Sequence, residues 1–178
     1  MTGISEREGA SQVLCVLALT ASLLIPASPS RAQPALPDSI AAPGTQAVMT
    51  VHAAGAQIYE CSPDASGRPF WRFREPIASL FLNGMTVGRH FAGPSWQLTD
   101  GSLLAGRAAA SSPGATGEDI PWLKLAVADG QASGQLAAVT VIQRINTSGG
   151  ALTGPCDTIG NLRPVPYSSE YVFLAPRN

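Results

Sequence analysis

Two hairpin signals follow each other closely in the middle of the chain, between Leu80 and Gly106. Asn83-Gly84 and Asp100-Gly101 each lie between short apolar runs. An Asn-Gly or Asp-Gly pair supplies the positive φ angles of a two-residue turn whose twist matches that of the flanking strands. The segment therefore predicts an antiparallel meander, and the rest of the chain must pack on it.

Further short runs of alternating or β-branched residues lie between turn signals on both sides of this meander. They predict strands at 47–52, 56–61, 70–74, 120–128, 135–145 and 167–174, with turns at Ala54-Gly55, 63–67 and Asp129-Gly130. No stretch has a sustained helical period, so the chain is predicted to be all-β. We expect a single-domain antiparallel β-sandwich, with a β-barrel as the alternative, because strand count alone does not decide closure.

The length of the chain indicates one domain, and its charge argues against some classes of binding partner. It has 178 residues, enough for one domain with a sizeable core, and a formal net charge of −1. There is no basic patch and no run of like charge. We therefore do not predict that the chain binds nucleic acid by neutralising phosphates, or that a polybasic segment binds it to anionic lipid.

The N-terminus has the features of an export signal. Residues 13–25 form an apolar run too short to span a bilayer comfortably, and Ser30-Arg31-Ala32 offers small residues at the −3 and −1 positions of a cleavage site. This predicts a signal peptide at 1–32 and a secreted or periplasmic mature chain without a membrane span; an uncleaved anchor is the alternative. Residues 33–46 predict a flexible lead-in, and 47–178 form the β domain.

Cleavage would remove Cys15 and leave Cys61 and Cys156. An even number of cysteines in an exported protein favours a disulfide, which would tie an early strand to a late loop. Two separate buried thiols are the alternative. No metal site is predicted, because no close C-x-x-C or H-x-x-x-H pair is present to start one.

His90 is the better of the two histidines as a candidate site residue. On the strand predicted at 85–91 it shares a face with Thr86 and Gly88, opposite the larger apolar side chains, and Gly93-Pro94 follows it. Glycine near a strand residue leaves space for a ligand or for another backbone. The competing interpretation is a structural histidine held by hydrogen bonds.

Aromatic side chains near strand starts and polar side chains on other strands could form a site for a small molecule or a glycan. The candidate ligand-binding residues are His90, Trp96, Arg89, Arg144, Asn146 and Trp122. For Trp71 and Tyr171, which stand among apolar neighbours, a core position is the favoured interpretation.

Several motifs occur in a fixed order along the chain. They include GAQIYEC at 55–61, VGRHFAGPSW at 87–96, IPWL at 120–123, QRINT at 143–147 and Cys156-Asp157. Together they resemble an exported bacterial and fungal family, domain of unknown function 3455. The resemblance implies an exported domain with two paired cysteines and no established activity. Some fungal members carry a malate dehydrogenase label, which this sequence does not support, because it lacks a G-x-G-x-x-G turn and a βαβ pattern.

Three classes of function stay open at this point. The first is an exported module that binds a small molecule or glycan, which the aromatic residues and His90 favour. The second is a hydrolase-like enzyme using His90, with Asp100 and a serine such as Ser95 or Ser102, although no G-x-S-x-G motif is present. The third is a structural envelope or interaction protein. No cofactor is predicted for any of them.

Overall fold

The computed structural model describes Gly3 and residues 35–177, so the rest of the predicted signal peptide and its cleavage site after Ala32 lie outside the described part. No helix in that part has the length and apolar character needed to cross a membrane. The elements are η1 (Asp38–Ile40), β1 (Thr45–Pro63), β2 (Pro69–Leu82), β3 (Met85–Phe91), β4 (Ser95–Leu98), β5 (Leu103–Ser112), β6 (Trp122–Ala132), η2 (Gly134–Leu136), β7 (Val141–Gly149) and β8 (Leu162–Pro176).

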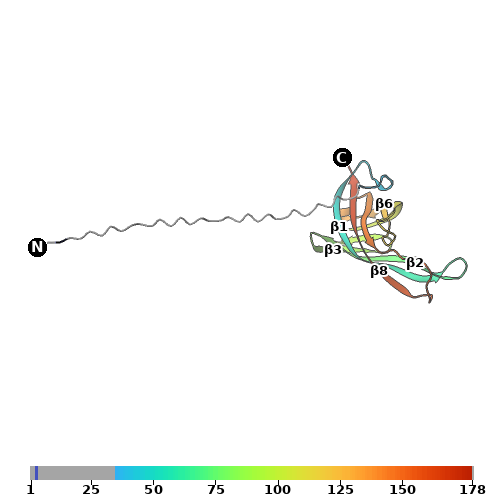
Figure 1. Cartoon of the computed structure of the whole chain (residues 1–178). Coiled ribbons are helices and arrows are strands. Elements are labelled where there is room, and N and C mark those ends of the chain that lie inside the picture. Colours follow the sequence, from blue (N-terminus) through green and yellow to red (C-terminus); the bar gives the residue numbers. More distant parts are fainter. Residues whose placement is uncertain (1–2, 4–34, 178) are drawn as a thin grey trace. The chain divides into compact units, whose positions relative to one another are not determined.

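The strands form one antiparallel sheet in sequence order, and the sheet closes because β1 pairs with both β2 and β8 (Figure 1). The prediction of an all-β antiparallel fold is confirmed. The strand pairing is that of the barrel alternative, but the barrel is irregular, because strand lengths range from 4 to 19 residues and register shifts interrupt several ladders. Facing walls share one hydrophobic core, as the two layers of a sandwich do.

Both hairpin signals of the meander form turns. Between β2 and β3, Asn83 and Gly84 have φ angles of 52° and 78°, which is the two-residue turn that the sequence predicts. Between β4 and β5 the turn is longer, and of the pair Asp100-Gly101 only Gly101 has a positive φ, of 87°. The Asp100 carboxylate accepts hydrogen bonds from the backbone and the hydroxyl of Ser102, both at 2.9 Å, and these bonds stabilise the longer form.

β1 is longer than the sequence predicts, because the turn expected at Ala54-Gly55 does not form. The strand continues through Gly55, which pairs with Ala78 of β2 on one side and with Tyr167 of β8 on the other. A Cβ atom at position 55 would lie 2.7 Å from the Cβ of Ala78. Gly55 therefore marks a close approach of two strands rather than a turn.

The connection between β6 and β7 also differs from the prediction. β6 continues through the turn signal at Asp129-Gly130, and η2 takes the place of the first part of the strand predicted at 135–145. Leu136 and Val139 are buried in the main core, and the backbone N–H of Gln135 donates to the hydroxyl of Ser102 at 2.8 Å. Burial of these two apolar side chains therefore outweighs strand extension, and the connection closes the end of the barrel beside the β4–β5 turn.

Part of the predicted lead-in packs on the barrel. Ile40 of η1 is fully buried and forms a second hydrophobic cluster with Trp122 and Ile145. Its carbonyl accepts a hydrogen bond of 2.8 Å from the side-chain amide of Gln143. The segment is therefore held from Asp38 onward, which the prediction of a flexible lead-in missed, because one isoleucine among prolines and alanines gives no periodic signal.

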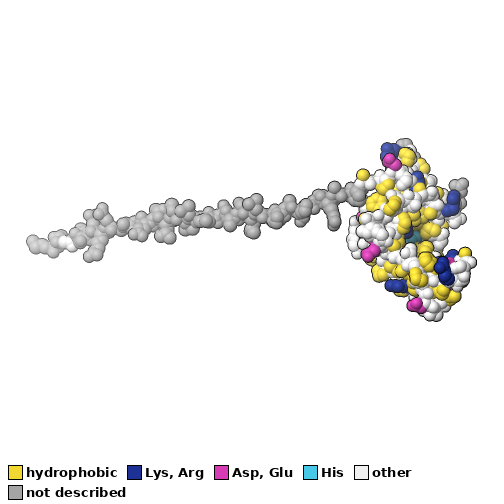
Figure 2. Space-filling model, turned by 45° about the vertical axis from the view of Figure 1, so that its right-hand side comes forward, with side chains coloured by type: hydrophobic (Ala, Val, Ile, Leu, Met, Phe, Trp, Pro, Cys, Tyr) yellow, Lys and Arg dark blue, Asp and Glu magenta, His cyan; other side chains and the backbone are white. Residues whose placement is uncertain are grey.

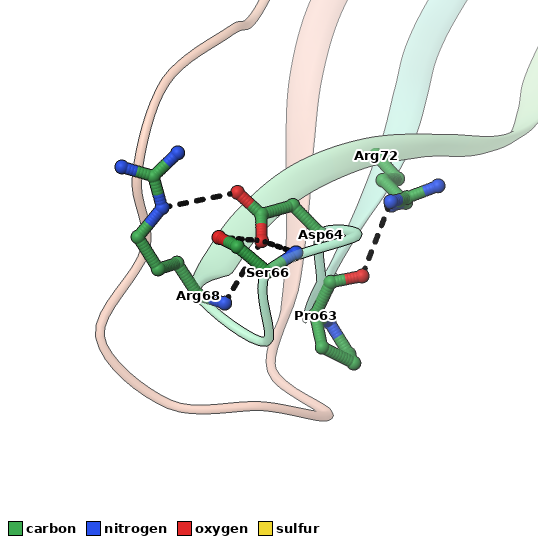
Figure 3. Close-up of polar contacts among 5 residues, drawn as sticks. All are labelled: Pro63, Asp64, Ser66, Arg68 and Arg72. Carbon is green, nitrogen blue, oxygen red and sulfur yellow. Dashed lines mark hydrogen bonds and ion pairs between the residues drawn. The ribbon is translucent and has the colours of Figure 1, made fainter.

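The hairpin of β1 and β2 turns where the sequence predicts a turn at 63–67, and side chains fix it (Figure 3). The carboxylate of Asp64 accepts hydrogen bonds from the hydroxyl of Ser66 at 2.7 Å and from the backbone N–H of Arg68 at 2.9 Å. These bonds lower the pKa of Asp64. Arg72 donates to the carbonyl of Pro63 at 3.1 Å and so links the two strands beyond the turn.

The disulfide predicted between Cys61 and Cys156 is present, with the two Cα atoms 5.9 Å apart. It ties the β7–β8 loop to β1. Tyr59 forms a second link to the same loop, because its hydroxyl donates to the carbonyl of Gly150 at 2.8 Å and accepts from the N–H of Leu152 at 3.2 Å. The loop is therefore anchored along the wall of the barrel opposite the closed end.

Candidate functional site

A cavity of about 370 Å³ lies at the end of the barrel away from η2, within the size range of small-molecule sites. Figure 2 shows one face of the domain, where a histidine side chain is visible at the base of a recess bordered by hydrophobic side chains. The cavity is lined by Gln57, Phe73, Arg74, Pro76, His90, Ala92, Gly93, Pro94, Trp96, Ala108, Leu123, Leu125, Arg144 and Tyr171.

Three aromatic rings in mutual contact form the inner wall of this cavity. His90 and Trp96 face each other across the β3–β4 ladder, and their rings stack at 4.5 Å with an interplanar angle of 16°. Tyr171 reaches them from β8, with its ring centre 4.9 Å from His90 and 5.2 Å from Trp96. The contact crosses the barrel interior, so it fixes the three side chains relative to one another.

His90 is neutral at neutral pH. Its Nδ1 lies 2.9 Å from the carbonyl oxygen of Ser95, which can only accept, so Nδ1 carries the proton and Nε2 remains an acceptor. Burial lowers the pKa of His90 to about 4; the hydrogen bond to Ser95 opposes this shift, and the charge of Arg144 adds to it. The ring therefore offers a lone pair to the cavity and no charge.

Arg144 places a positive charge on the cavity wall, in register with Tyr171 on the neighbouring strand. Its Nε and Nη2 donate to the carbonyl of Pro121 at 3.1 and 2.8 Å. A guanidinium has five N–H groups, so three of them remain free of this contact. Among the described residues no carboxylate lies within ion-pair distance of Arg144, whereas Arg74 at the same cavity lies 3.3 Å from the carboxylate of Glu75.

Buried polar groups beside Arg144 make no hydrogen bond of standard geometry within residues 35–177, although the Tyr171 hydroxyl lies near Tyr167, Ser169 and Arg144, and the Tyr167 hydroxyl lies near Gln57. They are the hydroxyl groups of Tyr171 and Tyr167 and the amide nitrogen of Gln57, and each of these residues is at most 4% exposed. Burial raises the pKa of both tyrosines, so their hydroxyls are protonated at neutral pH. An unpaired buried polar group costs about 1–3 kcal/mol. These groups therefore form a buried polar cluster beside the cavity whose hydrogen bonds are not well satisfied by the protein alone.

The arrangement considered for a hydrolase is not assembled. Ser95 presents its carbonyl to His90, and the carboxylate of Asp100 binds Ser102 and the side chain of Gln135 at the closed end of the barrel. The nucleophile, base and acid of a catalytic triad must lie within hydrogen-bond reach of one another. No carboxylate lines the cavity, and no cluster of His, Cys, Asp or Glu suited to a metal ion occurs in the described part of the chain.

The comparison with protein families gives one result. A family model with the description "Protein of unknown function (DUF3455)" matches residues 41–175. The chain belongs to this family. The match covers the barrel from just before β1 to the second-last residue of β8, so the cavity is part of the DUF3455 domain. No curated protein and no solved structure gives a significant match.

The DUF3455 domain brings together three of the six predicted ligand-binding residues at the cavity. These are His90, Trp96 and Arg144. Arg89 is adjacent to His90 in sequence, so strand alternation places it on the outer face. There its guanidinium donates two hydrogen bonds to the side chain of Gln97, at 3.1 and 2.7 Å, and lies 4.9 Å from the ring centre of Phe91.

Asn146 and Trp122 also lie away from the cavity. The side-chain amide of Asn146 donates to the carboxylate of Glu170 at 3.0 Å, and this pair joins β7 to β8. Trp122 is buried in the second hydrophobic cluster, against Ile40. Neither position could be separated from a cavity position by sequence, because the shift in the β7–β8 register and the packing of η1 are tertiary features.

The glycines near His90 do not leave space for a ligand. The space beside Gly88 is filled by the backbone carbonyl of Gln97, and the space beside Gly93 by the side chain of Ser95. These glycines therefore admit another part of the chain and not a ligand. His90 faces the cavity because its strand face points inward.

Gln57 and Tyr171 are cavity residues that the sequence candidates did not include. Tyr171 was assigned to the core and is both core and cavity wall, since it is 1% exposed and still lines the hollow. Gln57 carries a signal that could have identified it. It is an amide on a strand face otherwise formed by Tyr59 and Cys61, and a polar residue on an inward face needs a partner.

Proposed function

We propose that this domain binds one small, largely apolar molecule inside the barrel, against His90, Trp96 and Tyr171. The observation that carries the proposal is a cavity of about 370 Å³ whose buried polar groups lack partners in the described structure. An eight-stranded barrel is wide enough to hold a single small ligand beside its own side chains.

The two ends of the barrel interior differ in a way that supports this proposal. The closed end is filled with aliphatic side chains, among them Leu80, Leu104 and Leu136, all fully buried. A purely structural barrel would continue this filling to the other end, because apolar cores avoid unpaired polar groups. Here the other end instead carries an imidazole, a guanidinium, a phenol and an amide around an unfilled space.

A small molecule fits these features better than a glycan. Sugars are commonly recognised on flat aromatic faces that solvent can reach. Trp96 and Trp122 are 0% and 7% exposed, so neither offers such a face. The proposal therefore concerns a molecule that enters the barrel.

The buried Trp96 gives a direct assay. We expect a ligand that enters the cavity to change the tryptophan fluorescence of the protein and to raise its Tm. Trp96→Phe should abolish most of the fluorescence change and weaken binding. Trp122→Phe is the matched control, because it removes another buried indole, from the second cluster, and should leave the response intact. A library of small apolar compounds and monosaccharides that leaves Tm and fluorescence unchanged would refute the proposal.

We also propose that the domain works outside the cytoplasm, in the periplasm or beyond the cell. The disulfide between Cys61 and Cys156 supports this placement, because disulfides persist in oxidising compartments. The apolar run at 13–25 followed by Ser30-Arg31-Ala32 supports it independently. Intact mass measured without reductant should show a chain that begins at Gln33 and lacks two hydrogens; a retained N-terminus with free thiols would contradict the proposal.

A further inference from the structure

We infer that the ligand of this cavity is a small organic carboxylate with a flat apolar body, and that Arg144 and Tyr171 hold its carboxylate group. The inference rests on the proposed function and specifies its ligand class. It follows from the charge, the hydrogen-bonding capacity and the shape of the cavity wall.

The positive charge of the cavity wall favours an anionic ligand. Arg144 lines the cavity and is partly buried, and none of the described carboxylates lies within ion-pair distance of it. Removing a guanidinium from water is unfavourable unless an anion or several acceptors compensate for it. The carbonyl of Pro121 takes two of its five N–H groups, and His90 is neutral. An anionic ligand would supply the missing negative charge.

The cavity wall has more free hydrogen-bond donors than acceptors, which also favours a carboxylate. The groups on the wall without a hydrogen bond of standard geometry are donors, namely the hydroxyl of Tyr171, the amide nitrogen of Gln57 and the N–H groups of Arg144 that do not reach Pro121. A carboxylate has two oxygens with about four lone-pair sites and donates nothing, so it can satisfy all three residues together. A cationic ligand would find only the Nε2 of His90 as a free ring acceptor, and it would face the charge of Arg144.

The apolar surfaces and the volume of the cavity restrict the rest of the ligand. Phe73 and Leu123, which are not fully buried, give the cavity a flat and an aliphatic surface next to the polar groups. A volume of about 370 Å³ admits a single substituted ring or a short branched chain and excludes a long lipid. The Nε2 of His90 would accept a hydrogen bond from a hydroxyl on that body. The simplest probes with these properties are benzoate and 4-hydroxybenzoate.

The test compares each acid with its neutral amide on the full chain expressed for export, using Trp96 fluorescence and native mass spectrometry. Benzoate should bind about 10- to 100-fold more tightly than benzamide, the range expected for a hydrogen-bonded charged group. Arg144→Gln should remove this preference. Arg74→Gln is the control for general charge, because Arg74 is already paired with Glu75, and it should keep the preference.

Each outcome bears on a different claim. Benzamide bound as tightly as benzoate by the unaltered protein would overturn the carboxylate inference and leave the proposed function standing. A blank with acids, amides and the wider library together would refute the proposed function itself. If Arg144→Gln does not fold, Tyr171→Phe replaces it, because this change removes only a hydroxyl that makes no hydrogen bond of standard geometry, and it should lower benzoate affinity more than benzamide affinity. An equal loss for both probes in Tyr171→Phe would also count against the inference.

Discussion

Lowering the pH from about 7.5 to about 4.5 should destabilise the domain through His90. The pKa of this side chain is about 4 in the folded protein and 6.5 without the protein environment. A group whose folded pKa is depressed gives its full contribution to stability above its unfolded pKa. As the pH falls below 6.5, His90 becomes protonated in the unfolded chain but stays neutral in the folded chain. The free energy of unfolding therefore falls until the pH reaches the folded pKa.

The size of the effect follows from the two pKa values. With 1.36 kcal/mol for each pKa unit, the complete transition corresponds to about 3.4 kcal/mol, and about 2.5 kcal/mol of it falls between pH 7.5 and pH 4.5. The depressed pKa values of Asp64, Asp100 and Asp119 act in another window, because their contribution is lost only as the pH falls below their model-compound value of 3.8. The interval between pH 4.5 and 6.5 therefore isolates the histidine.

Urea unfolding followed by tryptophan fluorescence at half-unit steps of pH measures this directly. The free energy of unfolding should fall with decreasing pH in the unaltered protein, and the slope should be reduced strongly in His90→Gln. His52→Gln is the matched control, because His52 is exposed, and its slope should equal that of the unaltered protein. A flat profile in the unaltered protein, or an undiminished slope in His90→Gln, would refute the assignment of a buried neutral histidine.

Three further changes test the fold. Reducing the bond between Cys61 and Cys156, which closes a separation of 95 residues, should lower the free energy of unfolding by about 4–5 kcal/mol in the chain-entropy model; denaturation with and without reductant measures it, and an unchanged midpoint would contradict it. Gly55→Ala should cost about 1–3 kcal/mol because the new methyl group meets β2, whereas Gly117→Ala, in open space, should cost little in the same urea titration. Ile40→Ala should cost about 2–5 kcal/mol if η1 is a docked part of the domain, and an unchanged Tm would show that it is not.

The sequence predicted the local parts of this structure well, because they depend on neighbouring residues. The turn at Asn83-Gly84 and the alternation that separates His90 from Arg89 are set by backbone preferences and by the two-residue period of a strand. The disulfide could also be predicted from the sequence, from the number of cysteines and the predicted compartment. Closure of the sheet was not accessible, since it depends on the pairing of β1 with β8, which are distant in sequence.

The candidate site shows the same division. His90 and Trp96 are direct partners in a short hairpin, so their proximity follows from the register of the turn between them. Arg144 and Tyr171 join them only because β7 and β8 form another part of the barrel wall, from which Tyr171 contacts His90. A single sequence contains residue types for such a site but not the register between distant strands, and for that reason Arg89, Asn146 and Trp122 seemed equally suitable.

Tyr171 provides the sharpest separation between stability and binding. Its buried hydroxyl makes no hydrogen bond of standard geometry, so Tyr171→Phe should stabilise the ligand-free protein by about 1 kcal/mol while weakening the binding of benzoate. Tyr59→Phe is the matched control, because the Tyr59 hydroxyl makes two hydrogen bonds to the β7–β8 loop, and its loss should destabilise the protein by about 1–3 kcal/mol. Thermal unfolding of both variants, with and without benzoate, measures the two effects together. A Tyr171→Phe protein that is less stable and binds unchanged would show that the hydroxyl serves the fold, and the cavity would lose one of the donors on which its proposed ligand depends.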